Sequence, residues 1–206
     1  MDMVNIKING VDLQVPQNYT ILQAAREAGI NIPTLCYLKD INEIGACRMC
    51  LVEVKGARSL VTACVYPVNE GMEVFTNTEK VRKARKTVLE LTLSNHDKKC
   101  LTCTRNQNCE LQKMCDDLGV TGIQFEGEIT AHAIDDVSAS IVRDNNKCVL
   151  CRRCIAACKK IQTVGAIDAL NRGFTTKIGS TFEMSLAATD CVNCGQCIAV
   201  CPVGAL

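Results

Sequence analysis

Two cysteine runs near the C-terminus constrain this chain more than any other feature of its sequence. They are CVLCRRCIAAC, from Cys148 to Cys158, and CVNCGQCIAVCP, from Cys191 to Pro202. Both follow the spacing Cys-x2-Cys-x2-Cys-x3-Cys, in which three cysteines of one loop hold an iron-sulfur cube and the fourth points to a neighbouring cube. Because the spacing occurs twice, it predicts a pair of [4Fe-4S] clusters rather than a chance arrangement of thiols.

The two predicted clusters exchange their fourth ligands. One is expected to be held by Cys148, Cys151, Cys154 and Cys201, and the other by Cys158, Cys191, Cys194 and Cys197. We expect residues 144–206 to form a ferredoxin-like domain whose clusters lie close enough for electrons to pass between them.

The composition favours a cytoplasmic metalloprotein. The chain has 16 cysteines in 206 residues, and its N-terminus, MDMVNIKINGVDLQVP, has no apolar signal-peptide segment, so we expect reduced thiols that bind metal. Because aromatic residues make up 3% of the chain and Trp is absent, clusters are expected to take the place of a large core. The net charge of +1 gives no reason to expect nucleic-acid binding. No apolar run approaches the roughly 18 residues of a membrane-spanning helix, so we expect no membrane insertion.

The first 78 residues have the pattern of a β-grasp domain. Two alternating apolar stretches flank the turn Asn9-Gly10, which predicts a β-hairpin over residues 4–15. Thr20 is placed to cap a short helix, ILQAAREA, which ends at Gly29. A hairpin followed by a helix suits a β-grasp domain, so the chain as a whole is expected to be an α+β protein.

Four cysteines in this first domain, residues 1–78, predict a [2Fe-2S] cluster. They are Cys36, Cys47, Cys50 and Cys64, and their gaps are related, but not identical, to those of plant-type ferredoxins. Gly45 and Ala46 are small enough to let backbone N–H groups approach the sulfurs, which is one control of cluster potential. Zinc is the alternative, since Cys47-x2-Cys50 is also a zinc half-site. The β-grasp pattern and the two ferredoxin-like runs favour iron.

A helix is predicted over residues 79–95. Apolar residues recur there at helical spacing, at Val81, Ala84, Val88 and Leu91. Basic residues crowd into the start of the same segment, at Lys80, Arg82, Lys83, Arg85 and Lys86. We interpret them as a solvated helix face in preference to a docking surface for an acidic carrier.

His96 follows this helix and precedes the cysteines Cys100, Cys103 and Cys109. Three cysteines leave a four-iron site one ligand short, so we expect His96 to complete a third [4Fe-4S] cluster in a small module, residues 79–118. Neutral imidazole removes one negative charge from the ligand shell, which should raise the potential of this cluster. Cys115 is interpreted as a small buried hydrophobe, and His132, in the polar connection 119–143, receives no role.

Together these motifs resemble a known family segment, the iron-sulfur N-terminal region of cytoplasmic [FeFe] hydrogenases and NAD-linked formate dehydrogenases. The large iron-sulfur subunit of respiratory complex I is similar in part. The resemblance depends on four stretches, GACRMCLVEV, HDKKCLTCTRNQNCELQ, SIVRDNNKCVLCRRC and CVNCGQCIAVCPVGAL.

The resemblance implies a non-catalytic electron-transfer subunit of an oxidoreductase complex. Its expected partners are a flavin/NAD subunit, a catalytic subunit of the formate dehydrogenase or hydrogenase type, and ferredoxin, in an assembly that bifurcates electrons. Family members continue into a catalytic domain, whereas this sequence ends at Leu206, and it has no glycine-rich nucleotide loop. We therefore expect no substrate site in it. The alternatives are a free-standing polyferredoxin, an N-terminal fragment of a catalytic [FeFe] hydrogenase, and a structural zinc protein.

Overall fold

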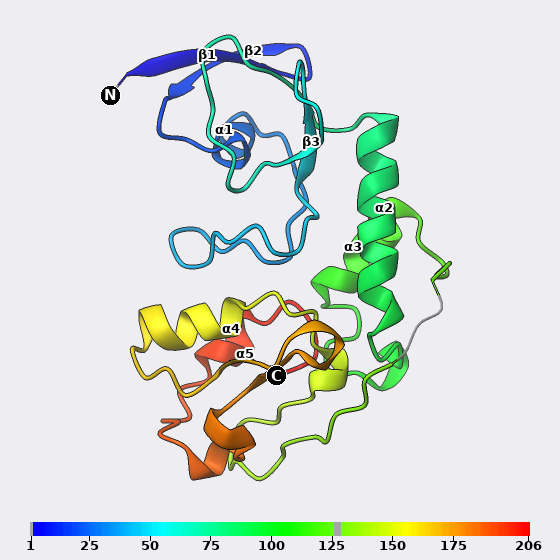
Figure 1. The fold of residues 1–206 in the computed structure, drawn as a ribbon, viewed down its shortest axis with the longest axis vertical. Coiled ribbons are helices and arrows are strands. Elements are labelled where there is room, and N and C mark those ends of the chain that lie inside the picture. Colours follow the sequence, from blue (N-terminus) through cyan, green and yellow to red (C-terminus); the bar gives the residue numbers. More distant parts are fainter. Residues whose placement is uncertain (1, 126–128) are drawn as a thin grey trace. The chain divides into compact units, whose positions relative to one another are not determined.

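The computed structural model describes residues 2–125 and 129–206. The chain divides into two compact units. Unit 1 comprises Met1–Tyr37 and Glu43–Leu89, and unit 2 comprises Leu38–Asn42 and Glu90–Leu206 (Figure 1). The chain therefore passes from one unit to the other three times, and a short piece of the N-terminal region belongs to unit 2.

Unit 1 contains a five-stranded mixed sheet and one short helix. Its elements are β1 (Met3–Ile8), β2 (Val11–Pro16), α1 (Ile21–Glu27), β3 (Leu51–Val54), β4 (Val61–Thr62) and β5 (Glu73–Phe75). The strand order is β2-β1-β5-β3-β4; β1 and β5 run parallel, and the other neighbours run antiparallel. A hairpin, then a helix, then a return strand parallel to the first strand is the arrangement of a β-grasp sheet.

The hairpin and the helix of unit 1 form where the sequence predicts them. Asn9 (φ 52°) and Gly10 (φ 86°) both adopt the left-handed conformation that a tight hairpin turn requires. Thr20 caps α1 in a capping box with Gln23, each side chain accepting from the other residue's backbone N–H. The apolar faces of the hairpin and the helix share one buried cluster, which includes the fully buried Ile8. Burial of each such aliphatic side chain contributes roughly 1.5–3 kcal/mol.

Helix α2 (Glu79–Ser94) confirms the predicted helix but changes the interpretation of its surface. Four of the five basic side chains at its start are exposed, as expected of a solvated face; the fifth, Arg85, is buried and donates to the Leu51 carbonyl at 2.6 Å. Leu91, expected on the apolar stripe, is 52% exposed, while Leu89 is fully buried. The spacing of apolar residues therefore predicts the helix. The burial of Arg85 depends instead on the Leu51 carbonyl, which belongs to strand β3.

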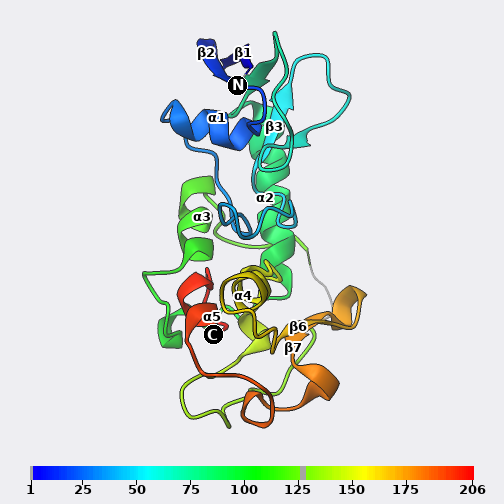
Figure 2. The same ribbon diagram turned by 90° about the vertical axis from the view of Figure 1, so that its left-hand side faces the viewer.

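Unit 2 is built from short elements joined by turns. They are α3 (Glu110–Leu118), α4 (Arg153–Ala156), a π-helical turn (Ala157–Ile161), β6 (Asp168–Leu170), β7 (Lys177–Gly179) and α5 (Gln196–Val200). Five 3-10 turns, at Cys100–Thr102, Asn145–Lys147, Gly173–Thr175, Thr181–Glu183 and Leu186–Ala188, complete the described part of this unit. Figure 2 shows the antiparallel pair β6–β7, which the sequence analysis did not anticipate.

The segment Leu38–Asn42 of unit 2 forms a closed turn. Leu38 and Asn42 exchange backbone hydrogen bonds of 3.0 and 2.7 Å, and the Asn42 side chain donates to the Cys151 carbonyl at 3.0 Å. Across residues 2–125 and 129–206, no helix has the length and apolar character needed to cross a membrane.

Candidate iron-sulfur sites

The four N-terminal cysteines lie in unit 1 as two close pairs. Cys50 and Cys64 Sγ are 3.3 Å apart, and the contact lowers the pKa of Cys50 and raises that of Cys64. A hydrogen bond between the thiols of Cys36 and Cys47 likewise lowers the pKa of Cys47 to about 6 and raises that of Cys36. In a [2Fe-2S] cluster each iron takes two protein ligands, so two sulfur pairs fit this group.

Backbone N–H groups surround this sulfur set. The N–H groups of Leu35 and Cys47 lie 3.4 and 3.5 Å from the sulfurs of Cys47 and Cys36, and the Ala46 N–H also acts on Cys36. Gly45 (φ 62°) lets the chain turn left-handed just before them. Such donors stabilise sulfur-borne negative charge, which is the role that the sequence analysis expected around residues 45–46.

In unit 2 the two C-terminal cysteine runs line two apolar cavities. Cys148, Cys151, Cys154 and Cys201 line one, and Cys158, Cys191, Cys194 and Cys197 line the other. Each cavity is thus lined by three cysteines of one run and one of the other, and the ligand exchange that the spacing predicts would use these same groups. Among residues 2–125 and 129–206, no three His, Cys, Asp or Glu side chains lie together as a site for a single metal ion.

Burial makes these thiols poor acids without metal. It raises the pKa of Cys148 to about 12 and that of Cys197 to about 11, and it raises the pKa of Cys154 as well. A cluster bound here would have to displace these protons, and its binding free energy would have to cover that cost. The chemistry of the two donor sets, four thiols around an apolar space, fits a four-iron cluster.

The two loops that carry these cysteines repeat the same backbone conformation. Leu150 and Arg152 in the first run, and Asn193 and Gly195 in the second, are left-handed, with φ between 53° and 74°. They occupy equivalent places between the cysteines. Three of the four are not glycines and so carry local strain, of the kind found where a ligand set over-determines the backbone.

The two runs end differently because proline follows the last cysteine of the second run and lysine follows that of the first. Pro202 follows Cys201, and α5 ends at Val200, since proline has no N–H with which to continue a helix. Lys159 follows Cys158 instead, and α4 continues through the π-helical turn to Ile161. Such turns are frequent at functional sites, and this one carries Cys158, the residue expected to serve the other cluster.

The predicted histidine site lies in the same unit. Burial lowers the pKa of His96, so its neutral form is favoured, as a metal-binding imidazole requires. Its Nδ1 atom is buried without a hydrogen-bond partner, and the ring interacts with the backbone of Lys147. A buried ring nitrogen without a hydrogen-bond partner fits a metal ligand. Burial raises the pKa of Cys109, and the charges of Cys103 and Cys100 raise it further, so the three cysteines lie near one another.

Direct contacts join the histidine segment to the C-terminal cysteine runs within unit 2. Glu110 forms two hydrogen bonds with Arg153, of 2.7 and 3.0 Å, and its backbone N–H donates to the Pro202 carbonyl at 2.9 Å. A Cβ atom built on Gly204 would lie 2.5 Å from Cys103 Sγ. These contacts could not be predicted from the sequence, because each joins residues more than 40 positions apart.

Two residues, Cys115 and His132, were given no ligand role. Cys115 is only half-buried, which departs from the buried hydrophobe that the sequence analysis expected, although burial raises its pKa to about 11. The backbone of His132 exchanges two hydrogen bonds of 2.9 Å with the Asn146 side chain.

Three family models match the chain in succession. Residues 1–79 match a 2Fe-2S iron-sulfur cluster binding domain, residues 85–124 the iron-sulfur binding region of NADH-ubiquinone oxidoreductase-G, and residues 147–205 a 4Fe-4S dicluster domain. The chain is thus an iron-sulfur protein with a 2Fe-2S domain and 4Fe-4S ferredoxin-like domains.

Its relatives are redox subunits. The chain is 47% identical over its whole length to the NADP-reducing hydrogenase subunit HndD of Solidesulfovibrio fructosivorans, covering 36% of that protein. Over 99% of its length it is 38% identical to the NADPH-Fe(3+) oxidoreductase subunit alpha of Geobacter sulfurreducens and 34% identical to the NADH-ubiquinone oxidoreductase 75 kDa subunit of Reclinomonas americana, covering 24% and 29% of them. The chain therefore spans about a third or less of these relatives.

A solved structure of an NAD+-reducing [NiFe]-hydrogenase matches 98% of the chain and 86% of its own chain, with a TM-score of 0.91 and 27% identity. These findings confirm the predicted resemblance to the iron-sulfur regions of hydrogenases and of complex I.

Proposed function

We propose that this chain conducts electrons between a flavin/NAD subunit and a partner that reacts with hydrogen, formate or ferredoxin in an electron-bifurcating complex. It does so through one [2Fe-2S] and three [4Fe-4S] clusters, held by the four ligand sets predicted from the sequence. The proposed modules are residues 1–78, 79–118 and 144–206, with 119–143 as a connection. The names of the relatives, which pair NAD(P) with hydrogen, iron or quinone, support a redox partner on each side.

The observation that carries this proposal is the pair of cavities lined by cysteines from both runs. Each cavity is apolar and is lined by four cysteines, a donor set that suits a [4Fe-4S] cluster. Clusters that share one small domain suit the one-electron steps of a relay.

A second candidate function has a specific observation behind it. The relative with 47% identity is a hydrogenase subunit of which this chain covers 36%, so the same relay could serve a catalytic domain in its own polypeptide. The resemblance also predicts a partner of the formate dehydrogenase type, and this partner stays a prediction. Identification of the polypeptides that copurify with the native protein discriminates between these arrangements.

The metal content tests the proposal. The 206-residue chain, purified and reconstituted without oxygen, is expected to hold about 14 iron atoms, a matching amount of acid-labile sulfide and almost no zinc. Dithionite should reduce it, but on its own it should reduce neither NAD with hydrogen or formate nor ferredoxin with NADH. Stoichiometric zinc, or about ten irons after full reconstitution, would remove one proposed site. Hydrogen- or formate-dependent dye reduction by the pure chain would refute a purely conducting role.

A further inference from the structure

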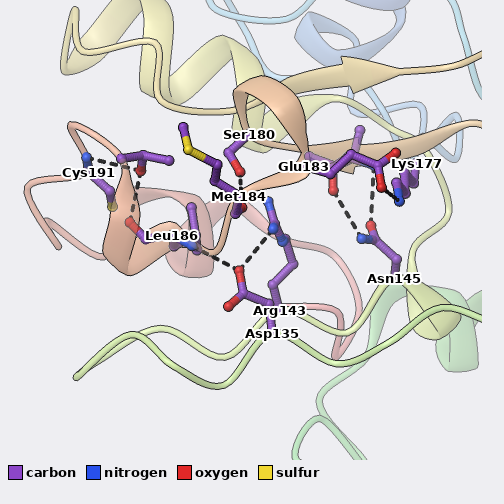
Figure 3. Close-up of polar contacts among 11 residues, drawn as sticks. Asp135, Arg143, Asn145, Lys177, Ser180, Glu183, Met184, Leu186 and Cys191 are labelled. Atoms are coloured by element: carbon purple, nitrogen blue, oxygen red, sulfur yellow. Dashed lines mark hydrogen bonds and ion pairs between the residues drawn. The ribbon is translucent and has the colours of Figure 1, made fainter.

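A buried arginine forms part of the wall of one cysteine-lined cavity. Arg143 is 7% exposed, and its backbone exchanges hydrogen bonds of 2.9 and 2.8 Å with Asp135. Its Nη2 atom donates to Asp135 Oδ2 at 2.8 Å, and the same carboxylate oxygen accepts from the Leu186 N–H at 3.0 Å (Figure 3). These contacts fix the guanidinium in one position.

The remaining donors of Arg143 have no protein partner. Its Nε and Nη1 atoms are buried and make no hydrogen bond, which is costly for a cation. Arg143 lines the cavity of Cys148, Cys151, Cys154 and Cys201. Sulfurs of a bound cluster carry negative charge and accept hydrogen bonds, so a cluster would supply what these donors lack.

The two members of the Arg143–Asp135 pair differ in which cavities they line. Arg143 lines both this cavity and an adjoining cavity of about 300 Å³, whereas Asp135 lines only the adjoining one. Of the pair, therefore, only the arginine contributes to the wall of the cavity that the four cysteines line.

The second cysteine cavity has a different electrostatic environment. Among the described residues that line it there is no charged side chain; its polar lining residues are Gln162 and Gln196, and the rest are cysteines and apolar residues. The first cavity adds Arg152 to Arg143, although Arg152 is exposed and its charge is screened by water. Among their lining residues, the two cysteine cavities thus differ by one buried cation, Arg143.

We propose that Arg143 sets the potential of the cluster held by Cys148, Cys151, Cys154 and Cys201 above that of its neighbour, so that an electron shared by the two rests on this cluster. Reduction adds one negative charge to the cluster, and a nearby cation stabilises that charge. Arg143 is a positioning residue that acts through the cluster and touches no substrate. The proposal rests on the ligand sets of the proposed function.

The test is a redox titration of the reconstituted chain, monitored by electron paramagnetic resonance. A Cys151→Ser variant assigns the signal of the cluster beside Arg143. We expect Arg143→Gln to lower the potential of that cluster, so that the ratio of reduced to oxidised cluster at a fixed potential falls about tenfold. A tenfold change in that ratio corresponds to about 59 mV for a one-electron couple.

Two further variants separate electrostatic control from a structural role. Asp135→Asn removes the negative end of the pair and should shift the same potential upward, by less because Asp135 lies outside the cavity. Arg143→Lys keeps the charge and should retain a potential near that of the parent. A merely structural ion pair predicts that both neutral variants destabilise the fold and that neither moves the potential.

The results decide the proposal as follows. Shifts of opposite sign for Arg143→Gln and Asp135→Asn support it, and shifts of the same sign, or none, overturn it. If Arg143→Gln assembles no cluster at this site, the direction of the Asp135→Asn shift decides alone. A parent chain whose iron content lacks this cluster contradicts the proposed function itself, which distinguishes that failure from a failure of the Arg143 assignment.

Discussion

Gly204→Ala is expected to damage the histidine-containing site although Gly204 is no ligand. A Cβ at this position would lie 2.5 Å from Cys103 Sγ, 3.5 Å from Thr104 Oγ1 and 3.6 Å from Arg105 Cγ. Ordinary contacts of this kind lie near 3.5–4.0 Å, so the sulfur has to retreat by about 1 Å. Gly204 has no positive φ that alanine would strain, so the effect comes from that contact alone.

The magnitude follows from which atom has to move. Overpacking of this kind typically costs about 1–3 kcal/mol. A free thiol could rotate away, but a sulfur bound to iron cannot, so the cost falls on the cluster-bound state. About 1–3 kcal/mol corresponds to a roughly 5- to 150-fold loss in cluster affinity. The stability of the iron-free chain should change little.

Gly122→Ala is the matched control, because a Cβ there meets nothing within 4 Å and Gly122 has no positive φ. Both variants are reconstituted with limiting iron, and iron content and the rate of cluster loss on heating are compared with the parent. We expect Gly204→Ala to lose about four irons selectively while Gly122→Ala keeps them. Equal iron content and equal rates for the two variants would refute the assignment of Cys103 as a fixed ligand.

Three further predictions concern single contacts. His96→Cys should keep a cluster with a lower potential, measured by redox titration, because thiolate adds a negative charge; an unchanged potential would remove His96 from the ligand set. Gly195→Ala should speed the loss of visible absorbance on heating, because alanine at this left-handed position destabilises the loop by about 1 kcal/mol. Arg152→Gly, at the equivalent position of the first run, should slow that loss for the converse reason. Effects of the same sign would contradict the equivalence of the two loops. Glu110→Ala should lower the free energy of unfolding of unit 2 by about 1–3 kcal/mol in denaturant, because it leaves the buried Arg153 unpaired. A loss below about 0.5 kcal/mol, which is typical of surface substitutions, would mean that water replaces the carboxylate.

The sequence predicts features that depend on neighbours in the chain. The hairpin around Asn9-Gly10 and the helix capped by Thr20 form as expected, because the turn, the cap and the alternation act within a few residues. The spacing also predicts two ligand sets of four among the C-terminal cysteines, which stay a prediction, and it says nothing about the other side chains that line the two cavities.

Features that depend on distant partners were not predictable. Arg85 stands in a run of basic residues that resembles a solvated face, and only the Leu51 carbonyl, 34 positions away, explains its burial. Arg143 and Asp135 are an ordinary pair of charges in the sequence. Their burial and their orientation depend on the Leu186 loop, 51 residues beyond Asp135.

The turn Leu38–Asn42 has a consequence for the biosynthesis of the protein. It leaves the ribosome with the N-terminal region, yet its Asn42 side chain bonds to the carbonyl of Cys151, 109 residues later. During translation the turn is made before Cys151, so its hydrogen bond to the Cys151 carbonyl cannot form until much later. Contacts between residues so far apart in sequence are slow to form. A fragment that begins at residue 90 would lack it altogether, so the C-terminal cysteine runs cannot be transplanted as an independent piece without removing one of their own supports.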